Sequence, residues 1–176
     1  TVQLTALGKS RGIGVVRSIR PAAIGDNFAA KPITQISTDQ VHSRPTGVGE
    51  FDRVLGGGIV PGAVVLLSGE PGVGKSTLLL EVAANSAKSG LKVLYVSGEE
   101  STGQIKLRAD RTGALSDNLY LASENDLATV LGQIDHLKPE LLIVDSVQTI
   151  IAGEIDGAAG MPSQVREVAA NLIRVA

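Results

Sequence analysis

The sequence lacks cysteine altogether, so disulfide bonds and thiolate metal sites are excluded for these 176 residues. This absence is typical of proteins from a reducing compartment, and we expect a cytoplasmic location. No apolar run approaches the roughly 20 residues that a membrane-spanning helix needs. The runs at residues 63–67 and 141–144 have the length of strands. We therefore expect no membrane partner.

Aromatic residues are also scarce, with two Phe, two Tyr and no Trp. So few rings offer no platform on which bases of a nucleic acid could stack. Charge of either sign is not in excess, because 16 Lys and Arg face 18 Asp and Glu, a net charge of −2. Bulk electrostatic attraction to nucleic acid or anionic lipid is excluded, and any DNA contact must be local or lie outside this sequence.

The sequence is rich in apolar residues, at 43%, with 19% charged residues, a composition typical of a globular domain. It begins with Thr1, and we expect it to be a piece of a longer protein. Glycine and proline interrupt residues 1–45, which predicts an irregular linker or N-terminal arm with at most a short strand at residues 14–18. Residues 46–176 are regular and predict the folded core.

Four basic residues of that arm could contact nucleic acid, although scattered basic residues are usually just solvated. They are Lys9, Arg11, Arg17 and Arg20. Both interpretations remain open from the sequence.

Strands and helices alternate through residues 46–176, which predicts an α/β fold with a mostly parallel sheet covered by helices on both faces. The apolar runs predict strands at residues 63–67, 93–96, 118–122 and 141–144. Helices are expected at residues 75–89, 103–111, about 123–137, and 164–175. Ser123 and Asp126 form a capping-box-like start for the third of these helices.

A glycine-rich segment between a predicted strand and a predicted helix matches G-x-x-x-x-G-K-[ST] in full. It consists of Gly69, Glu70, Pro71, Gly72, Val73, Gly74, Lys75 and Ser76. Glycines let backbone N–H groups converge on phosphate oxygens, and the helix N-terminus adds positive potential. Lys75 would then reach the β- and γ-phosphates, Ser76 would bind Mg²⁺, and Thr77 would touch an inner phosphate. The alternative is a glycine-rich turn with a surface lysine.

Carboxylates follow two of the predicted strands. Asp145 ends the strand at residues 141–144, where an acid can hold a magnesium shell, or can simply cap the strand end. Glu99 and Glu100 follow the strand at residues 93–96, and Glu99 lies 24 residues beyond Lys75. No glutamate follows Asp145 directly, so Glu99 is the favoured base for orienting water, with Glu100 as its neighbour or substitute. Two adjacent acids in a loop are otherwise usually solvated.

Together these residues resemble the RecA-type ATPases, and most closely the RadA/Sms family of bacterial DNA-repair ATPases. The segments that carry the resemblance are residues 44–62, 68–81, 95–101, 144–149 and 163–168. The TGxxxxDxxLGGG pattern at residues 46–58 is shared with KaiC-like ATPases and discriminates less. The resemblance covers residues 44–176 well and residues 1–43 poorly.

The resemblance implies that Glu99 is the catalytic glutamate and Asp145 the magnesium-shell aspartate. It places the family's first pore loop at residues 151–162, which the residues alone describe only as a flexible acidic loop with Glu154 and Asp156. It further implies an ATP-driven motor that forms a homo-hexameric ring on single-stranded DNA and processes recombination intermediates by branch migration beside a recombinase. The family's zinc finger and C-terminal domain have no counterpart in these residues.

Two other functions remain open from the sequence. A KaiC-like ATPase or kinase would act on protein partners, and a nucleotide-gated binding module would hold ATP as a switch while barely hydrolysing it. The sequence does not reveal adenine selectivity or the number of subunits.

Overall fold

The structure, a computed structural model, describes residues 29–36 and 42–176. The chain forms two compact units, Thr1–Ser37 and Thr38–Ala176. The described part of the first unit contains one short 3₁₀ helix, η2 (Ile33–Gln35). The strand predicted at residues 14–18 and the four basic residues of the arm lie outside the described residues, and the boundary predicted at residue 45 stays a prediction.

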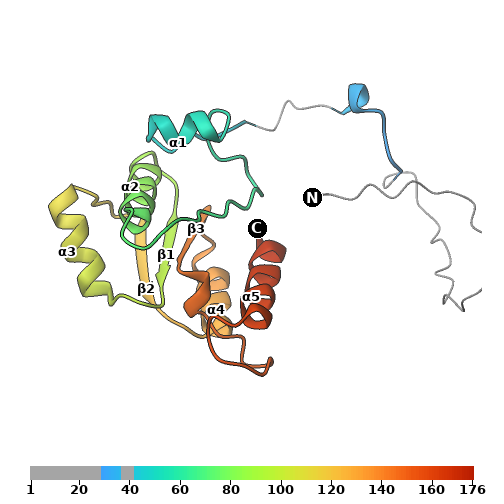
Figure 1. The fold of residues 1–176 in the computed structure, drawn as a ribbon. Helices are drawn as coiled ribbons and strands as arrows, with labels where there is room; N and C mark the ends of the chain where they lie inside the picture. The colour runs from blue at the N-terminus through green and yellow to red at the C-terminus, as the bar shows by residue number, and fades with distance from the viewer. Residues whose placement is uncertain (1–28, 37–41) are drawn as a thin grey trace, which may run out of the picture. The chain divides into compact units, whose positions relative to one another are not determined.

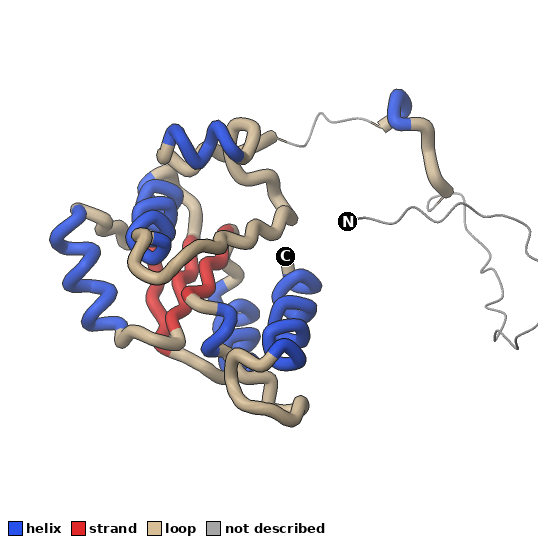
Figure 2. Tube along the Cα trace, in the orientation of Figure 1, coloured by secondary structure: helices blue, strands red, loops and turns tan. Residues whose placement is uncertain are grey.

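The second unit holds a three-stranded parallel sheet in the order β2-β1-β3 (Figures 1 and 2). Its strands are β1 (Val93–Ser97), β2 (Leu119–Ser123) and β3 (Leu141–Asp145). Its helices are α1 (Gly49–Val54), α2 (Lys75–Lys88), α3 (Thr102–Thr112), α4 (Leu127–Leu137) and α5 (Pro162–Val175), with the 3₁₀ helix η3 (Val147–Thr149). The predicted α/β class with a parallel sheet is confirmed.

Helices cover both faces of this sheet. Alternate side chains of the central strand β1 point to opposite sides, so both faces of the sheet carry apolar groups that need to be buried. Val93 and Tyr95 pack with Leu80 of α2 and Ile105 of α3, in one apolar cluster. Leu94 and Val96 pack on the other face, where α4 and α5 supply Leu127, Val130 and Val168. All five residues of β1 are buried, which is why this strand reads as a continuous apolar run.

Local signals fix where the helices start and stop. Gly90, at φ +101°, follows the end of α2 in a left-handed conformation that favours glycine. Ser101 and Gln104 form a reciprocal capping box at the start of α3. The predicted start of α4 at Ser123 is wrong: Ser123 is the last residue of β2, and Asp126 caps the helix by accepting from the Thr129 amide at 2.8 Å. This hydrogen bond lowers the pKa of the Asp126 carboxyl.

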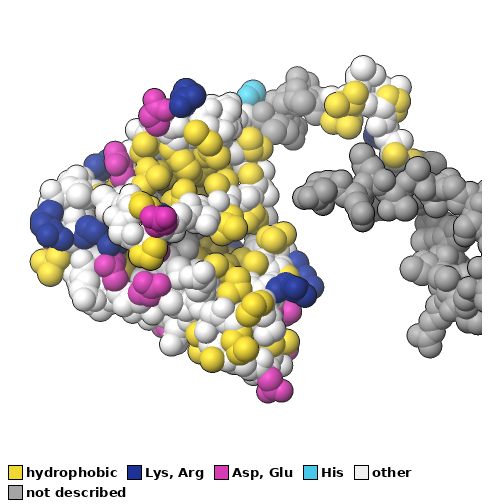
Figure 3. Space-filling view, in the orientation of Figure 1, with side chains coloured by type: hydrophobic (Ala, Val, Ile, Leu, Met, Phe, Trp, Pro, Cys, Tyr) yellow, Lys and Arg dark blue, Asp and Glu magenta, His cyan; other side chains and the backbone are white. Residues whose placement is uncertain are grey.

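The strand predicted at residues 63–67 is also wrong for this chain. The segment has no regular secondary structure and pairs with no described strand, and its first four side chains are exposed, with Leu66 at 80%. Apolar side chains gather on this side of the second unit (Figure 3). An apolar run becomes a strand only where a neighbouring strand accepts its hydrogen bonds, and composition alone does not supply that neighbour.

The short helix α1 was not predicted from the sequence. Two hydrogen bonds within residues 46–52 hold its start, although no side chain caps the helix itself: the Thr46 amide donates to Asp52 Oδ1 at 2.7 Å and the Val48 amide donates to Thr46 Oγ1 at 3.3 Å. The first of these bonds lowers the pKa of the Asp52 carboxyl. Tertiary contact also matters here, since Phe51 packs against the cluster formed by α2 and β1.

Candidate nucleotide site

The phosphate loop, residues 69–76, leads directly into α2. Gly72 and Gly74 have φ of +79° and +93°, a conformation that residues with a Cβ rarely adopt. Gly74 forms the N-cap of α2, and no side chain caps this helix end. Backbone N–H groups of the first turn are therefore left for a ligand, which suits an anion such as polyphosphate.

The Lys75 ammonium lies over this loop. Its Nζ donates to the carbonyl oxygens of Gly69 at 2.8 Å and Glu70 at 2.7 Å. The lysine thus bridges from the first turn of α2 back to the start of the loop. A positive charge held at this position can pair with phosphate oxygens that enter the loop.

The loop lies at the carboxyl end of the sheet. A four-residue connection joins α2 to β1, and the helix packs along the strand, so the two run antiparallel (Figure 1). The N-terminus of α2 therefore lies toward the end of β1 at Ser97. Ligands of open α/β sheets bind at this carboxyl end.

Asp145 lies at the same end, on the strand next to β1. In the register of the parallel pair, Ser97 faces Asp145 and Tyr95 faces Ile143. Ile143 packs into the cluster with α2, and alternation along β3 sends Asp145 to that same face. The Tyr95 hydroxyl donates to Asp145 Oδ2 at 2.7 Å. The carboxylate is thus directed to the side of the sheet that carries the phosphate loop.

Glu99 and Glu100 sit on a turn that is fixed by a buried serine. Ser97 is 1% exposed, and its Oγ accepts from the amides of Glu99 at 3.3 Å and Glu100 at 3.0 Å. Gly98 lies against Thr149, whose Oγ1 would be 2.2 Å from an added Cβ. The turn therefore tolerates no side chain at residue 98, and its position relative to β3 is fixed.

The two glutamates have different partners. Arg108 of α3, 16% exposed, forms a two-pronged ion pair with Glu100, with Nη1–Oε1 at 3.0 Å and Nη2–Oε2 at 2.8 Å. Glu99 is exposed and accepts from Ser146 Oγ at 2.9 Å. Of these two glutamates, only Glu99 has a carboxylate without a cationic partner in the described part of the chain.

The structure thus places the two predicted carboxylates at neighbouring strand ends, with Asp145 as the last residue of β3 and Glu99 just after β1. Lys75 bonds to its own loop, and no hydrogen bond links it to either carboxylate among the described residues. No cluster of three or more metal-ligating side chains occurs in the described ranges. The hydroxyl of Ser76 and the carboxylate of Asp145 suit Mg²⁺, which takes few protein ligands and completes its shell with phosphate oxygens and water.

Sequence reasoning assigned no role to four residues that support the site: Tyr95, Ser97, Arg108 and Ser146. All four belong to the segments or residues that resemble the family, but their spacing does not reveal their partners, because each acts across strands or elements. Ser146 also follows Asp145 directly, so its hydroxyl lies beside a strand end.

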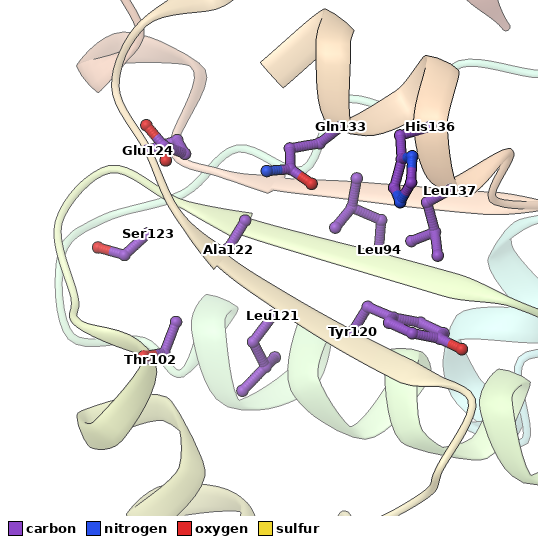
Figure 4. Close-up of a pocket in the computed structure, with 10 residues that line it drawn as sticks. All are labelled: Leu94, Thr102, Tyr120, Leu121, Ala122, Ser123, Glu124, Gln133, His136 and Leu137. Carbon is purple, nitrogen blue, oxygen red and sulfur yellow. The ribbon is translucent and has the colours of Figure 1, made fainter. Parts of the chain in front are cut away.

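A hollow of about 490 Å³ lies elsewhere, between β2 and α4 (Figure 4). Tyr120, Gln133 and His136 line it, and none of the predicted site residues does. In the described part of the chain, no helix is long and apolar enough to cross a membrane.

Residues 151–157, part of the predicted pore loop, are anchored by Gln164 of α5, which is 0% exposed. Its Oε1 accepts from the Ala152 amide at 2.8 Å, and its Nε2 donates to the carbonyl of Ile155 at 2.6 Å. Ile151 also bridges Asp126 at the start of α4. The start of this loop is therefore fixed, which a glycine-rich acidic composition did not predict.

Comparison with known proteins agrees with these features. The family model described as "ATPase: KaiC" matches residues 44–130. The DNA repair protein RadA of Mycolicibacterium smegmatis is 56% identical over 156 residues, 89% of this chain and 32% of that protein. The protein of the same name from Mycobacterium tuberculosis is 53% identical over 175 residues, 98% of this chain and 35% of that protein. That from Streptococcus pneumoniae is 44% identical over 164 residues, 93% of this chain and 39% of that protein.

The chain therefore spans about a third of the length of these relatives. The resemblance expected from the motifs is confirmed. The match to the Mycobacterium tuberculosis protein extends over 98% of the chain, and the expectation that residues 1–43 resemble the family less well than residues 44–176 stays a prediction.

Proposed function

The chain belongs to the RadA family of DNA repair proteins, as a segment about a third of their length, and we propose that it binds ATP with Mg²⁺ and hydrolyses it. One observation carries this proposal: Asp145 and the turn that carries Glu99 lie at the carboxyl ends of neighbouring paired strands, the end at which α2 and its phosphate loop begin. A loop that binds phosphate, an acid for the metal and a separate acid for water are the parts that phosphoryl transfer to water needs.

Binding rests on the phosphate loop. The amides of residues 69–76 and the N-terminus of α2 would hold the β- and γ-phosphates, with Thr77 at an inner phosphate. Lys75 would exchange its bonds to the Gly69 and Glu70 carbonyls for bonds to phosphate oxygens. Ser76 and Asp145 would hold Mg²⁺, which supplies positive charge that stabilises the transferring phosphoryl group.

Hydrolysis would use Glu99 as the group that orients water and accepts its proton during in-line attack on the γ-phosphorus. The ion pair between Glu100 and Arg108 supports this choice, because it occupies the neighbouring carboxylate. The leaving group is ADP, and Lys75 would stabilise the charge that develops on the phosphate oxygens.

In the whole protein, we infer that this hydrolysis drives a homo-hexameric ring on single-stranded DNA, which processes recombination intermediates by branch migration beside a recombinase in the cytoplasm. The printed name of the relatives, DNA repair protein, supports a role in DNA repair. The balanced charge of this chain supports DNA contact through local groups or other parts of the protein. Strong stimulation of ATP hydrolysis by single-stranded DNA is the expected result for the full-length protein, and its absence would favour a KaiC-like action on protein partners.

Two variants test the site in the full-length protein. Lys75→Ala should weaken ATP affinity in an equilibrium binding assay by at least about tenfold, because a charge-assisted contact of ~1.5–3 kcal/mol is lost. Glu99→Gln should bind ATP normally and lose at least ~100-fold in turnover, the usual contribution of a general base. Full affinity in Lys75→Ala would refute the phosphate site. Unchanged turnover in Glu99→Gln would favour a nucleotide-gated switch.

A further inference from the structure

Two hydroxyl groups cross the gap between β1 and β3 in opposite directions. Tyr95 belongs to β1 and donates to Asp145 of β3 at 2.7 Å. Ser146 follows β3 and donates to Glu99, which follows β1, at 2.9 Å. Each of the two carboxylates assigned to the reaction therefore accepts a hydrogen bond from the strand that carries the other one.

We propose that these two bonds form a reciprocal brace, in which Tyr95 positions Asp145 toward the metal and Ser146 positions Glu99 toward the attacking water. Tyr95 and Ser146 are positioning residues, since each acts through a carboxylate. The inference rests on the proposed function, because it assigns a purpose to the supports of that same site.

Tyr95 is suited to a fixed role because its surroundings allow its side chain little freedom. The residue is 0% exposed and packs among Leu80, Ile105 and Ile143 in the core. A buried phenol needs a hydrogen-bond partner, and Asp145 supplies it.

The second bond is held at both ends as well. The Ser146 carbonyl accepts from the Thr149 side chain at 2.8 Å and from the Thr149 amide at 3.2 Å, which closes η3 behind it. Thr149 in turn lies against Gly98, next to Glu99. The Ser146 hydroxyl and the Glu99 turn therefore keep a fixed relation, and the bond orients the carboxylate.

If Tyr95 and Ser146 had a merely structural role, removal of either hydroxyl would cause the same kind of loss of activity. The brace predicts different losses, because one bond serves the metal ligand and the other serves the base. Removal of a group that orients a metal ligand typically costs 10–100-fold in metal affinity. Removal of a group that orients the base leaves metal affinity unchanged and slows the chemical step.

The test uses the full-length protein and steady-state ATP hydrolysis over a range of Mg²⁺ concentrations. Tyr95→Phe should raise the Mg²⁺ concentration for half-maximal rate about tenfold and change kcat at saturating Mg²⁺ by less than about threefold. Ser146→Ala should lower kcat about tenfold with an unchanged Mg²⁺ requirement, and Ser146→Thr, which keeps the hydroxyl, should recover at least about half of that loss.

Matched controls are Tyr120→Phe on β2 and Ser123→Ala at the end of the same strand; both residues are exposed, and neither takes part in the two bonds. Both should match the wild type. Equilibrium ATP binding in the presence of excess Mg²⁺ checks that each variant is folded. If Tyr95→Phe does not fold, the comparison of Ser146→Ala with Ser146→Thr still tests the hydrogen bond between Ser146 and Glu99.

Wild-type behaviour of both brace variants, or equal changes of kcat and Mg²⁺ requirement in both, would overturn the brace. The variants Asp145→Asn and Glu99→Gln, measured in the same assay, distinguish failure of the brace from failure of the proposed function. If those two variants lose activity while Tyr95→Phe and Ser146→Ala do not, the brace alone is wrong. If they hydrolyse ATP like the wild type, the proposed site itself is wrong.

Discussion

At the scale of single residues, neighbours decide the different roles of two adjacent glutamates. Glu99 and Glu100 have the same chemistry and sit on one turn, held by Ser97. Arg108 takes Glu100 into an ion pair, and Ser146 gives Glu99 a single neutral hydrogen bond. Because this ion pair occupies the Glu100 carboxylate, we propose the role of base for Glu99 and a structural role for Glu100.

This division predicts opposite effects of two substitutions. Glu100→Gln should lower the free energy of unfolding by about 1–3 kcal/mol, less than the ~3–5 kcal/mol of a fully buried pair because Glu100 is 37% exposed. Its turnover should stay within about threefold of the wild type. Chemical denaturation and steady-state hydrolysis of the same preparation measure both quantities.

Glu99→Gln is the matched comparison for that experiment. It should keep its stability within about 0.5 kcal/mol, as exposed side chains usually do, while turnover collapses. A Glu100→Gln variant that is inactive but stable would reverse the assignment of the two carboxylates.

At the scale of elements, a single buried side chain ties a loop to a helix. Gln164 is enclosed, and its amide meets the backbone of residues 152–157 through four hydrogen bonds. Backbone groups in a buried loop must find partners, and glycine-rich segments offer few of their own. The first half of the loop therefore depends on α5 for its conformation.

We predict that Gln164→Ala destabilises the chain by about 2–4 kcal/mol, because it leaves the Ala152 amide and nearby carbonyl groups without partners. Amide hydrogen exchange at Ala152 should accelerate at the same time. Gln133→Ala, an exposed position on α4, is the control and should change stability by less than about 0.5 kcal/mol. Equal denaturation midpoints for the two variants would show that the anchor contributes nothing.

At the scale of the whole molecule, the sheet has an open side. In the described residues, β3 pairs with β1 alone, and residues 63–67 form an apolar segment without a strand partner. Val64, Val65 and Leu66 of that segment are 55%, 44% and 80% exposed. Apolar side chains and unpaired strand edges of this kind usually meet a partner in the complete protein.

The chain spans about a third of its relatives, and this leads to a prediction for a protein of their full length. Amides of residues 63–67 should become protected from hydrogen exchange, as in a paired strand, by at least ~100-fold relative to the 176-residue chain. Amides of β1 are buried in both and serve as the internal standard. Equally fast exchange at residues 63–67 in both proteins would contradict the strand that the sequence pattern predicts.

The site was predictable in part because its main residues are contiguous or end an apolar run. The residues 69–76 carry their own geometry, since glycines permit positive φ at Gly72 and Gly74 and a helix starts directly after them. Asp145 and Glu99 follow apolar strands, and parallel strands bring their carboxyl ends together. Local rules of backbone conformation and strand direction are thus enough to predict the phosphate loop and to nominate both acids.

What the sequence determined by itself is the class of fold, and it nominated the phosphate loop, Asp145 and Glu99, because each of these depends on neighbours in the chain. Tertiary structure decided the pairing of strands, the different partners of Glu99 and Glu100, and the hydrogen bonds of Tyr95 and Ser146. These depend on contacts between residues some 8 to 50 positions apart. The physical reason is that a hydrogen bond or ion pair across two strands depends on register and facing direction, which only the assembled sheet fixes.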